Sequence, residues 1–142
     1  MRPFYSHTQR GALTLLAIIP AAVGMAVGAY FTGRWLAFAP LAVVVVGIVA
    51  VFSSLTVEVA TDELSWHFGP GVWRKTIARA EIVSAVVVTN KWWWGWGVHL
   101  TPRGWLYNVE GLEAVEIALK DGKTLRIGSD EAANLARALS RA

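Results

Sequence analysis

Histidine and acidic side chains are common acid–base groups and metal ligands in proteins, and this chain has no cysteine that could act as a nucleophile or a ligand. No histidine or acidic residue follows His7, His67 or His99 at a distance of two or four positions, the spacing that aligns two ligands on a strand or a helix. Glu113 and Glu116 are three positions apart, so in a strand they point to opposite sides. The sequence therefore predicts a protein that is not an enzyme, with no metal, no cofactor and no small-molecule substrate.

The positive charge of this sequence is concentrated in its N-terminal part. The formal net charge is +3, yet after residue 55 ten lysines and arginines are balanced by ten acidic residues. The excess comes from Arg2, Arg10 and Arg34. A nucleic-acid-binding protein gathers its basic residues on one surface, so the sequence argues against nucleic acid as a partner.

Two apolar runs occupy residues 11–31 and 35–54. Arg34 is the only charged residue between positions 11 and 55, while charged residues make up 16% of the whole chain. Each run has about the 20 residues that a helix needs to cross a bilayer. We therefore predict a transmembrane helical hairpin at 11–54 after a tail at 1–10. A cleaved signal peptide is the less favoured alternative, because the apolar core of a signal is only about 7–15 residues long.

Small residues inside the two runs indicate how the helices pack. Gly24 and Gly28 are four positions apart, and Gly47 lies in the second run. Glycines at this spacing let membrane helices approach closely. Because each run is the other's nearest neighbour, we expect these glycines to pack the two helices of one chain against each other, and not to form a dimer.

Residues 55–142 alternate between apolar and polar side chains and predict a small β domain. The alternation is typical of strands that are buried on one face, and Asp121-Gly122 favours a tight hairpin turn. A closing helix at 130–141 is indicated by Leu135 and Leu139, four positions apart. The expected strands are 55–59, 64–68, 73–78, 82–89, 97–101, 105–108, 114–119 and 124–127.

Three segments of this domain resemble a known family. They read LTVEVATDELSWHFGPGVWRKTIARAEI, GWGVHLTPRGWLYNVEG and AVEIALKDGKTLRIGSDE. They are similar to bacterial pleckstrin-homology-like (PH-like) domains of small membrane proteins, a family without an established activity. The resemblance implies an α+β protein: an antiparallel β sandwich or barrel of seven or eight strands, with a C-terminal capping helix, after two transmembrane helices. Phosphoinositide-binding PH domains have a basic first turn, but here residues 60–63 are acidic, which argues against that ligand.

A tryptophan-rich segment interrupts the strand pattern at residues 90–96. It contains Trp92, Trp93, Trp94 and Trp96. If successive strands reverse direction from the end of the second helix, this segment returns to the membrane side of the domain, together with Lys91 and Trp73. Indole rings favour the bilayer interface, so we predict a membrane-interface loop. The alternative is that two or more of these rings fill the domain core.

Arg74, Lys75 and Arg79 form a small basic group that could contact an anion, although an ordinary solvated strand face is the favoured interpretation. The sequence as a whole predicts a non-catalytic membrane-anchored module that binds a protein partner or membrane lipid headgroups. The alternative is a structural or assembly subunit that docks to a larger membrane complex through its helical hairpin.

The distribution of basic residues predicts the orientation. Arg2 and Arg10 precede the first helix, whereas the turn between the helices has Arg34 alone. Basic residues favour the cytoplasmic side, so we expect both termini in the cytoplasm of a bacterium, with the hairpin in its inner membrane. Reporter enzymes fused after residue 142 and within the turn at 32–34 test this. A C-terminal fusion that is active in the periplasm would contradict it.

Overall fold

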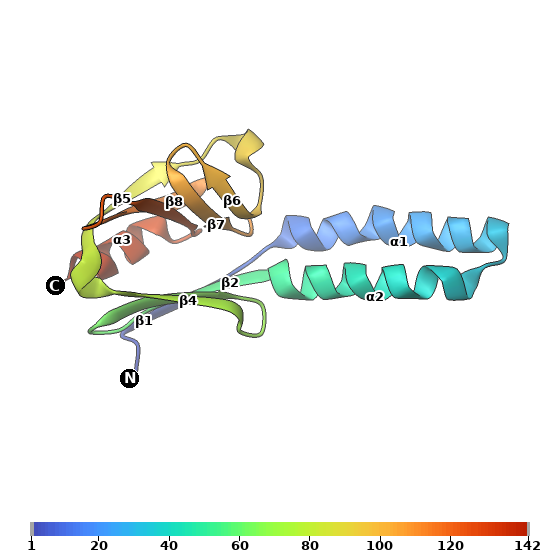
Figure 1. Ribbon diagram of the computed structural model, residues 1–142, viewed down its shortest axis with the longest axis horizontal. Helices are drawn as coiled ribbons and strands as arrows, with labels where there is room; N and C mark the ends of the chain where they lie inside the picture. The colour runs from blue at the N-terminus through green and yellow to red at the C-terminus, as the bar shows by residue number, and fades with distance from the viewer. Residues whose placement is uncertain (1, 142) are drawn as a thin grey trace.

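The computed structural model describes residues 2–141, except for the side chains of Leu13, Thr14, Leu15 and Ala17. Over those residues the chain is an α+β protein with three α-helices and two sheets, of four and five strands. Two helices extend from the β domain as a long shaft (Figure 1). The helices are α1 (Ala12–Thr32), α2 (Trp35–Phe52) and α3 (Ala132–Ser140), and the strands are β1 (Tyr5–Arg10), β2 (Ser54–Val59), β3 (Glu63–Phe68), β4 (Val72–Ala78), β5 (Ile82–Thr89), β6 (Gly97–Thr101), β7 (Gly104–Asn108), β8 (Glu113–Leu119) and β9 (Thr124–Gly128).

Residues 1–10 are not simply a tail, as the sequence suggested, because they contain strand β1. β1 pairs antiparallel with β2 from Tyr5 opposite Val59 to Arg10 opposite Ser54. One residue further on, the N–H of Gly11 donates to the carbonyl of Ser53 over 2.7 Å. The strand pair therefore continues directly into the helix pair, and the chain enters and leaves the shaft at one place.

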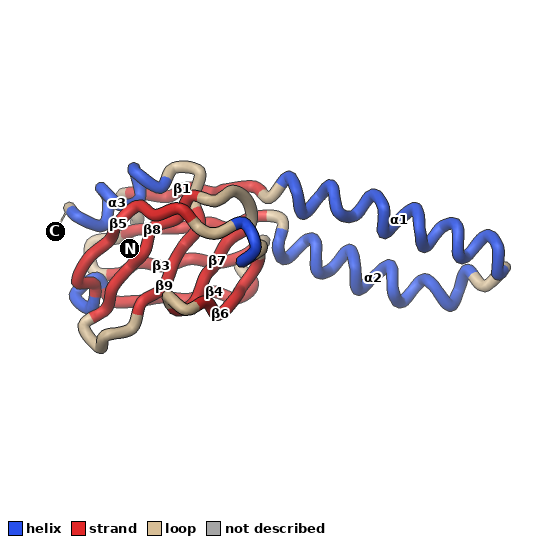
Figure 2. The backbone as a smooth tube through the Cα atoms, turned by 90° about the horizontal axis from the view of Figure 1, so that it is seen from above, coloured by secondary structure: helices blue, strands red, loops and turns tan. Residues whose placement is uncertain are grey.

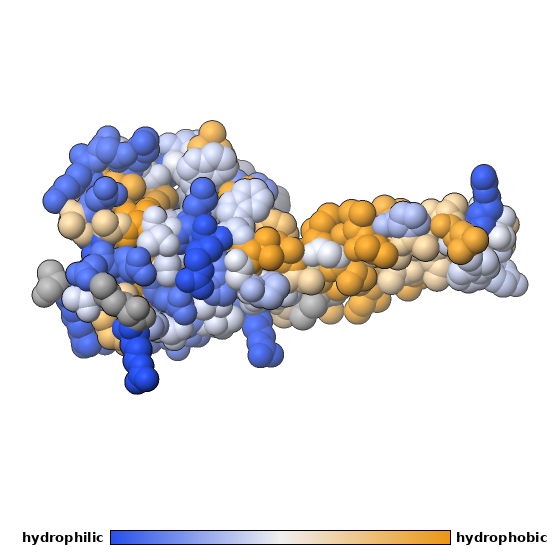
Figure 3. Space-filling model, turned by 60° about the horizontal axis from the view of Figure 1, so that its bottom comes forward, coloured by the Kyte–Doolittle hydropathy of each residue, from blue (hydrophilic) through white to orange (hydrophobic). Residues whose placement is uncertain are grey.

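The shaft consists of α1 and α2, which lie side by side along their length (Figures 1 and 2). Gly33, with φ +64°, ends α1 in the left-handed conformation that glycine adopts easily. Figure 3 shows the shaft as mainly apolar, with a polar tip at the end far from the domain. Among the described residues, α2 is the one helix long and apolar enough to span a membrane, and 18–32 form a shorter apolar stretch of α1.

The three glycines that were expected to pack the helices have different surroundings. A Cβ at Gly28 would lie 3.1 Å from the Phe38 ring of α2, so this position is a close helix–helix contact. A Cβ at Gly24 or at Gly47 would meet no atom within 4 Å. Of the three, only Gly28 is placed where its lack of a side chain lets the helices approach.

The two sheets have the strand orders β1-β2-β3-β4 and β5-β8-β9-β7-β6. All eight strands expected from the sequence are present, each with ends within one residue of those predicted. The expectation of a wholly antiparallel domain is wrong at one pair, because β7 and β9 are parallel. The β8–β9 hairpin inserts β9 beside β7, where a Cβ at Gly104 would overlap the Thr124 carbonyl oxygen. Glycine is therefore needed at position 104 for the two strands to come together.

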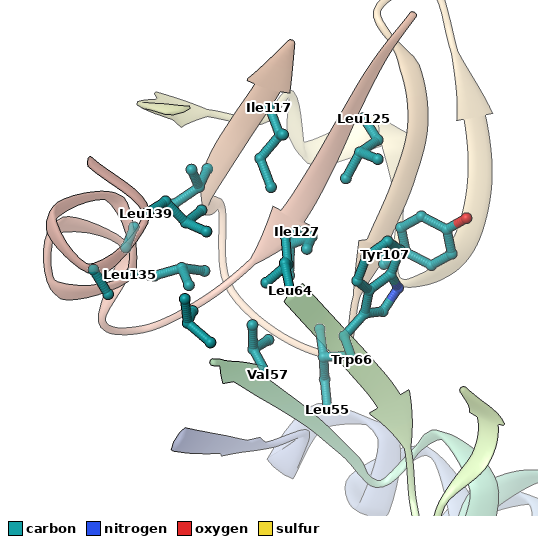
Figure 4. Close-up of a cluster of buried hydrophobic side chains, with 14 of the residues drawn as sticks. Leu55, Val57, Leu64, Trp66, Tyr107, Ile117, Leu125, Ile127, Leu135 and Leu139 are labelled. Carbon is teal, nitrogen blue, oxygen red and sulfur yellow. The ribbon is translucent and has the colours of Figure 1, made fainter. Parts of the chain in front are cut away.

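The core lies between the two sheets and is closed at one end by α3 (Figure 4). The alternating positions of β2 and β3 are buried, from Leu55 to Phe68, and face Tyr107, Ile117 and Ile127 of the other sheet. Leu135 and Leu139 of α3 are buried in the same cluster, which confirms the predicted C-terminal helix.

The contact at Gly28 generates a test with a matched control. Gly28→Leu would push a side chain into Phe38, and overpacking of this kind costs about 1–3 kcal/mol. Gly24→Leu adds the same side chain where the space is open. We expect only the Gly28 variant to lose helix content at lower concentrations of a denaturing detergent, as followed by circular dichroism. Equal sensitivity of the two variants would show that Gly28 is not a packing contact.

Candidate functional site

The tryptophan-rich segment is the connection between the two edges of one sheet. β5 and β6 lie at opposite edges of the five-stranded sheet, so residues 90–96 must cross the positions of β8, β9 and β7. The connection contains a short 3₁₀ turn, η2 (Trp92–Trp94). Figures 1 and 2 place this turn at the end of the domain from which the shaft emerges. That this end of the domain faces a membrane, as the sequence predicted, stays a prediction.

A charge pair between buried Arg126 and half-buried Glu116 holds this connection on the sheet. Arg126 of β9 is directly opposite Glu116 of β8. Its Nε donates to Glu116 Oε2 over 2.8 Å, and its Nη2 lies 2.7 Å from the same oxygen in an ion pair. Its Nη1 donates to Oδ1 of buried Asn90 over 3.0 Å. The Trp94 ring covers the guanidinium at 5.0 Å, a cation–π geometry. Asn90, which precedes η2, and Trp94, its last residue, are therefore both attached to one arginine.

The other three tryptophans of the connection project into the surroundings. Trp92 and Trp93 are 74% and 60% exposed, and Trp96 is also exposed. Trp92 and Trp93 meet edge to face at 5.8 Å, and Lys91 Nζ lies 5.1 Å from the Trp93 ring. None of the four tryptophans belongs to the buried core cluster. The alternative in which two or more of them fill the core is wrong.

A further tryptophan, Trp73, lies on the other side of the shaft. Trp73 follows the β3–β4 turn, is exposed, and has a φ of +57°. The same turn is packed on the end of α2: the N–H of Gly69 donates to the Ser54 carbonyl over 2.9 Å, and a Cβ at Gly69 would lie 2.7 Å from the carbonyl oxygen of Ala50. The two loops flank the base of the shaft (Figure 1). We call Trp73, Trp92, Trp93 and Trp96 the tryptophan collar.

The domain is fastened to the start of α1 by residues that the sequence analysis did not identify. α1 has no cap from its own N-terminal residues, but Glu110 Oε2 accepts from the N–H of Ala12 over 2.7 Å. Buried Gln9 donates from Nε2 to the Glu110 carbonyl over 2.9 Å. A carboxylate is favourable at a helix N-terminus, where unpaired N–H groups carry partial positive charge. The missing cap before the first apolar run was the available signal that another segment must supply one.

The three basic residues considered for an anion contact have separate surroundings. Arg79 donates to five backbone carbonyls, those of Ala60, Thr61, Ala138, Leu139 and Arg141, and so joins the β2–β3 turn to the end of α3. Arg74 pairs with Glu58 of β2 over 3.7 Å. Lys75 is exposed on edge strand β4. Arg79 therefore has a structural role at the end of the domain away from the shaft.

A further polar contact joins the first strand to the last helix. His7 Nε2 lies 2.6 Å from Asp130 Oδ1, and its Nδ1 lies 3.6 Å from Glu131. Burial, and then the nearby Glu131 and Asp130 carboxylates, raise the pKa of Tyr5 to about 12. In the core, burial raises the pKa of Tyr107. The histidine contacts join β1 to the segment that leads into α3.

Within the described residues, neither a cluster of metal ligands nor similarity to a known protein marks a site. Over residues 2–141, no three histidine, aspartate or glutamate side chains gather as metal ligands. Comparison with protein-family models, curated proteins and solved structures finds no match. The resemblance to PH-like domains therefore stays a prediction from sequence, and the collar is the most distinctive surface of the domain.

The buried charge pair predicts how the connection responds to mutation. Arg126→Met leaves the Glu116 carboxylate without its partner and removes the support of Trp94, at a cost of about 2–3 kcal/mol. Arg103→Met, in the exposed β6–β7 turn, changes the same residue type where its side chain is in solvent. Urea unfolding of the full chain in micelles should show a lower unfolding free energy for the Arg126 variant only. Equal stabilities would mean that the pair does not hold the connection.

Proposed function

We propose that this protein is a non-catalytic, membrane-anchored module. In this proposal α1 and α2 cross the bacterial inner membrane as a hairpin, and the β domain lies against the cytoplasmic face. There it presents its surface to a protein partner or to lipid headgroups.

The observation that carries the proposal is the tryptophan collar around the base of the shaft. Exposed tryptophans on both sides of a pair of apolar helices would be an unfavourable apolar surface in water. At a bilayer interface, each ring can place its apolar body among the chains while its N–H stays hydrated. The collar and the shaft therefore favour the same plane for the membrane surface.

The exposure of the shaft supports the same conclusion. α2 has no buried residue, and side chains as large as Leu36 and Val43 are more than 70% exposed. A helix that is apolar all round is covered either by protein or by lipid, and the β domain covers only its base (Figure 1). Removal of α1 as a signal peptide would also remove β1, which is paired with β2.

The fold supports a PH-like domain in part. Two sheets enclose one core, and a C-terminal helix closes one end, as the resemblance implies. Strand β1 and the parallel pair β7–β9 are departures from the expected arrangement. We therefore propose a PH-like domain to which the N-terminal strand has added an edge.

Tryptophan quenching tests the placement of the collar. In nanodiscs with lipids brominated at a shallow depth, the fluorescence of the wild-type chain should be quenched, and Trp92→Ser/Trp93→Ser should lower the quenched fraction. Trp105→Ser is the control, because Trp105 is exposed near the start of β7 next to Leu125, away from the collar. An equal quenched fraction in the wild type and the double variant would contradict the proposal.

A further inference from the structure

A groove of about 340 Å³ lies where α2 meets the five-stranded sheet. One wall comes from the last turn of α2, and the other from the start of β6 and the end of β7 (Figure 1). The residues that line it include Ile48, Phe52, Trp96, Val98, His99 and Val109. The groove thus combines one wall from the proposed membrane span with one wall from the domain, and one member of the tryptophan collar lies at its margin.

We propose that this groove binds an acyl chain of one phospholipid from the leaflet next to the domain. The inference rests on the proposed function, since it requires α2 to lie in a bilayer. Ile48 is exposed, Val98 is half-buried and Val109 is buried, so an occupant meets hydrocarbon on both walls. Phe52 closes the end toward the core, where its ring lies 5.3 Å from that of Phe68.

The continuity of the groove with the surface of α2 identifies the occupant. Ile48 and Val44 are one turn apart on the same face of α2, and both are exposed. In a bilayer that face is covered by lipid chains, so the groove opens directly onto them. From Ile48 to Phe52 the groove follows α2 for about 6 Å, at 1.5 Å per residue. A chain can therefore enter from the side without leaving the apolar layer.

The size and polarity of the groove also fit a hydrocarbon chain. Pockets for whole drug-sized ligands span about 300–1,000 Å³. The groove, at about 340 Å³, is at the lower end of this range. A phospholipid is larger than a drug-sized ligand, so the groove accommodates part of one and not all of it. The most polar group on the wall is His99, and its Nε2 already contacts the Trp96 carbonyl. The groove therefore selects for apolar shape, while the Trp96 ring remains exposed beside its opening.

Photocrosslinking in nanodiscs tests this binding directly. The probe is a phosphatidylcholine with a diazirine on its acyl chain, mixed in small proportion into phosphatidylethanolamine and phosphatidylglycerol. After irradiation of the full chain, mass spectrometry should find adducts on residues 96–99 as well as on α2. Ile48→Trp fills the groove with an apolar ring and should abolish the adducts on 96–99 only. Val46→Trp places the same ring on the opposite face of α2 and should leave them unchanged.

The adducts on α2 separate failure of this inference from failure of the proposed function. Adducts on α2 with none on 96–99 in the wild type would overturn the lipid groove while leaving the membrane anchor in place. Adducts on 96–99 that persist in Ile48→Trp would also overturn it, as would a crosslink of this segment to a second copy of the chain. Absence of adducts from α2 itself would contradict the proposed function.

Discussion

Backbone hydrogen bonding between β1 and β2 determines how the rest of this structure is arranged. The ladder runs from Tyr5 opposite Val59 to Arg10 opposite Ser54 and ends in the Gly11–Ser53 bond at the first turn of the shaft. Because β1 runs into α1 and β2 begins where α2 ends, the two helices leave the domain side by side from this point. The contact of Glu110 with the N-terminus of α1 adds a second attachment from the opposite sheet. The β domain and the shaft are therefore joined by hydrogen bonds from both sheets, and the domain has a defined side that faces along the helices.

Because the domain has a defined side, the exposed tryptophans have a defined position relative to the helices. A tryptophan-rich loop on an independently moving domain would have no fixed relation to a bilayer, whereas here Trp73 and the β5–β6 connection lie on either side of the helices. The seven residues of the connection include some that are fixed on the sheet and some that are exposed. Asn90 and Trp94 are fixed on Arg126, and Trp92 and Trp93 are left outside. The contacts of Arg126 with Glu116 and Asn90 give the loop a defined position on the sheet.

Several features were readable from the sequence because their signals are local. The strand alternation around Leu64, the Asp121-Gly122 turn and the Leu135–Leu139 spacing each depend on a few neighbouring residues, and each corresponds to an element of the structure. The first strand escaped prediction because its six residues, YSHTQR, are mostly polar. Its partner is β2, some 50 positions away, so no short segment contains the information that this strand forms.

Arg79 shows, for a single side chain, the same difference between local signals and partners that are distant in the sequence. Its neighbours Arg74 and Lys75 suggested a basic strand face, but its actual partners are carbonyls of residues 60–61 and 138–141. Backbone carbonyls are present at every residue, so no pattern of side chains can indicate which of them an arginine will meet. The tryptophans of the connection were ambiguous for a related reason, since the sequence could not show that Trp94 is supported by Arg126, 32 positions later.

By itself the sequence determined the apolar shaft, eight strands and the closing helix, because apolar runs, alternation and turn residues act over a few positions. Only the tertiary structure decided the strand order with its parallel β7–β9 pair, the addition of β1, and the choice of which tryptophans are exposed. Those features depend on hydrogen bonds and packing between segments far apart in the chain. Backbone hydrogen bonds between strands have nearly the same strength whichever residues supply them, so pairing is decided when the whole core is assembled and not by any single segment.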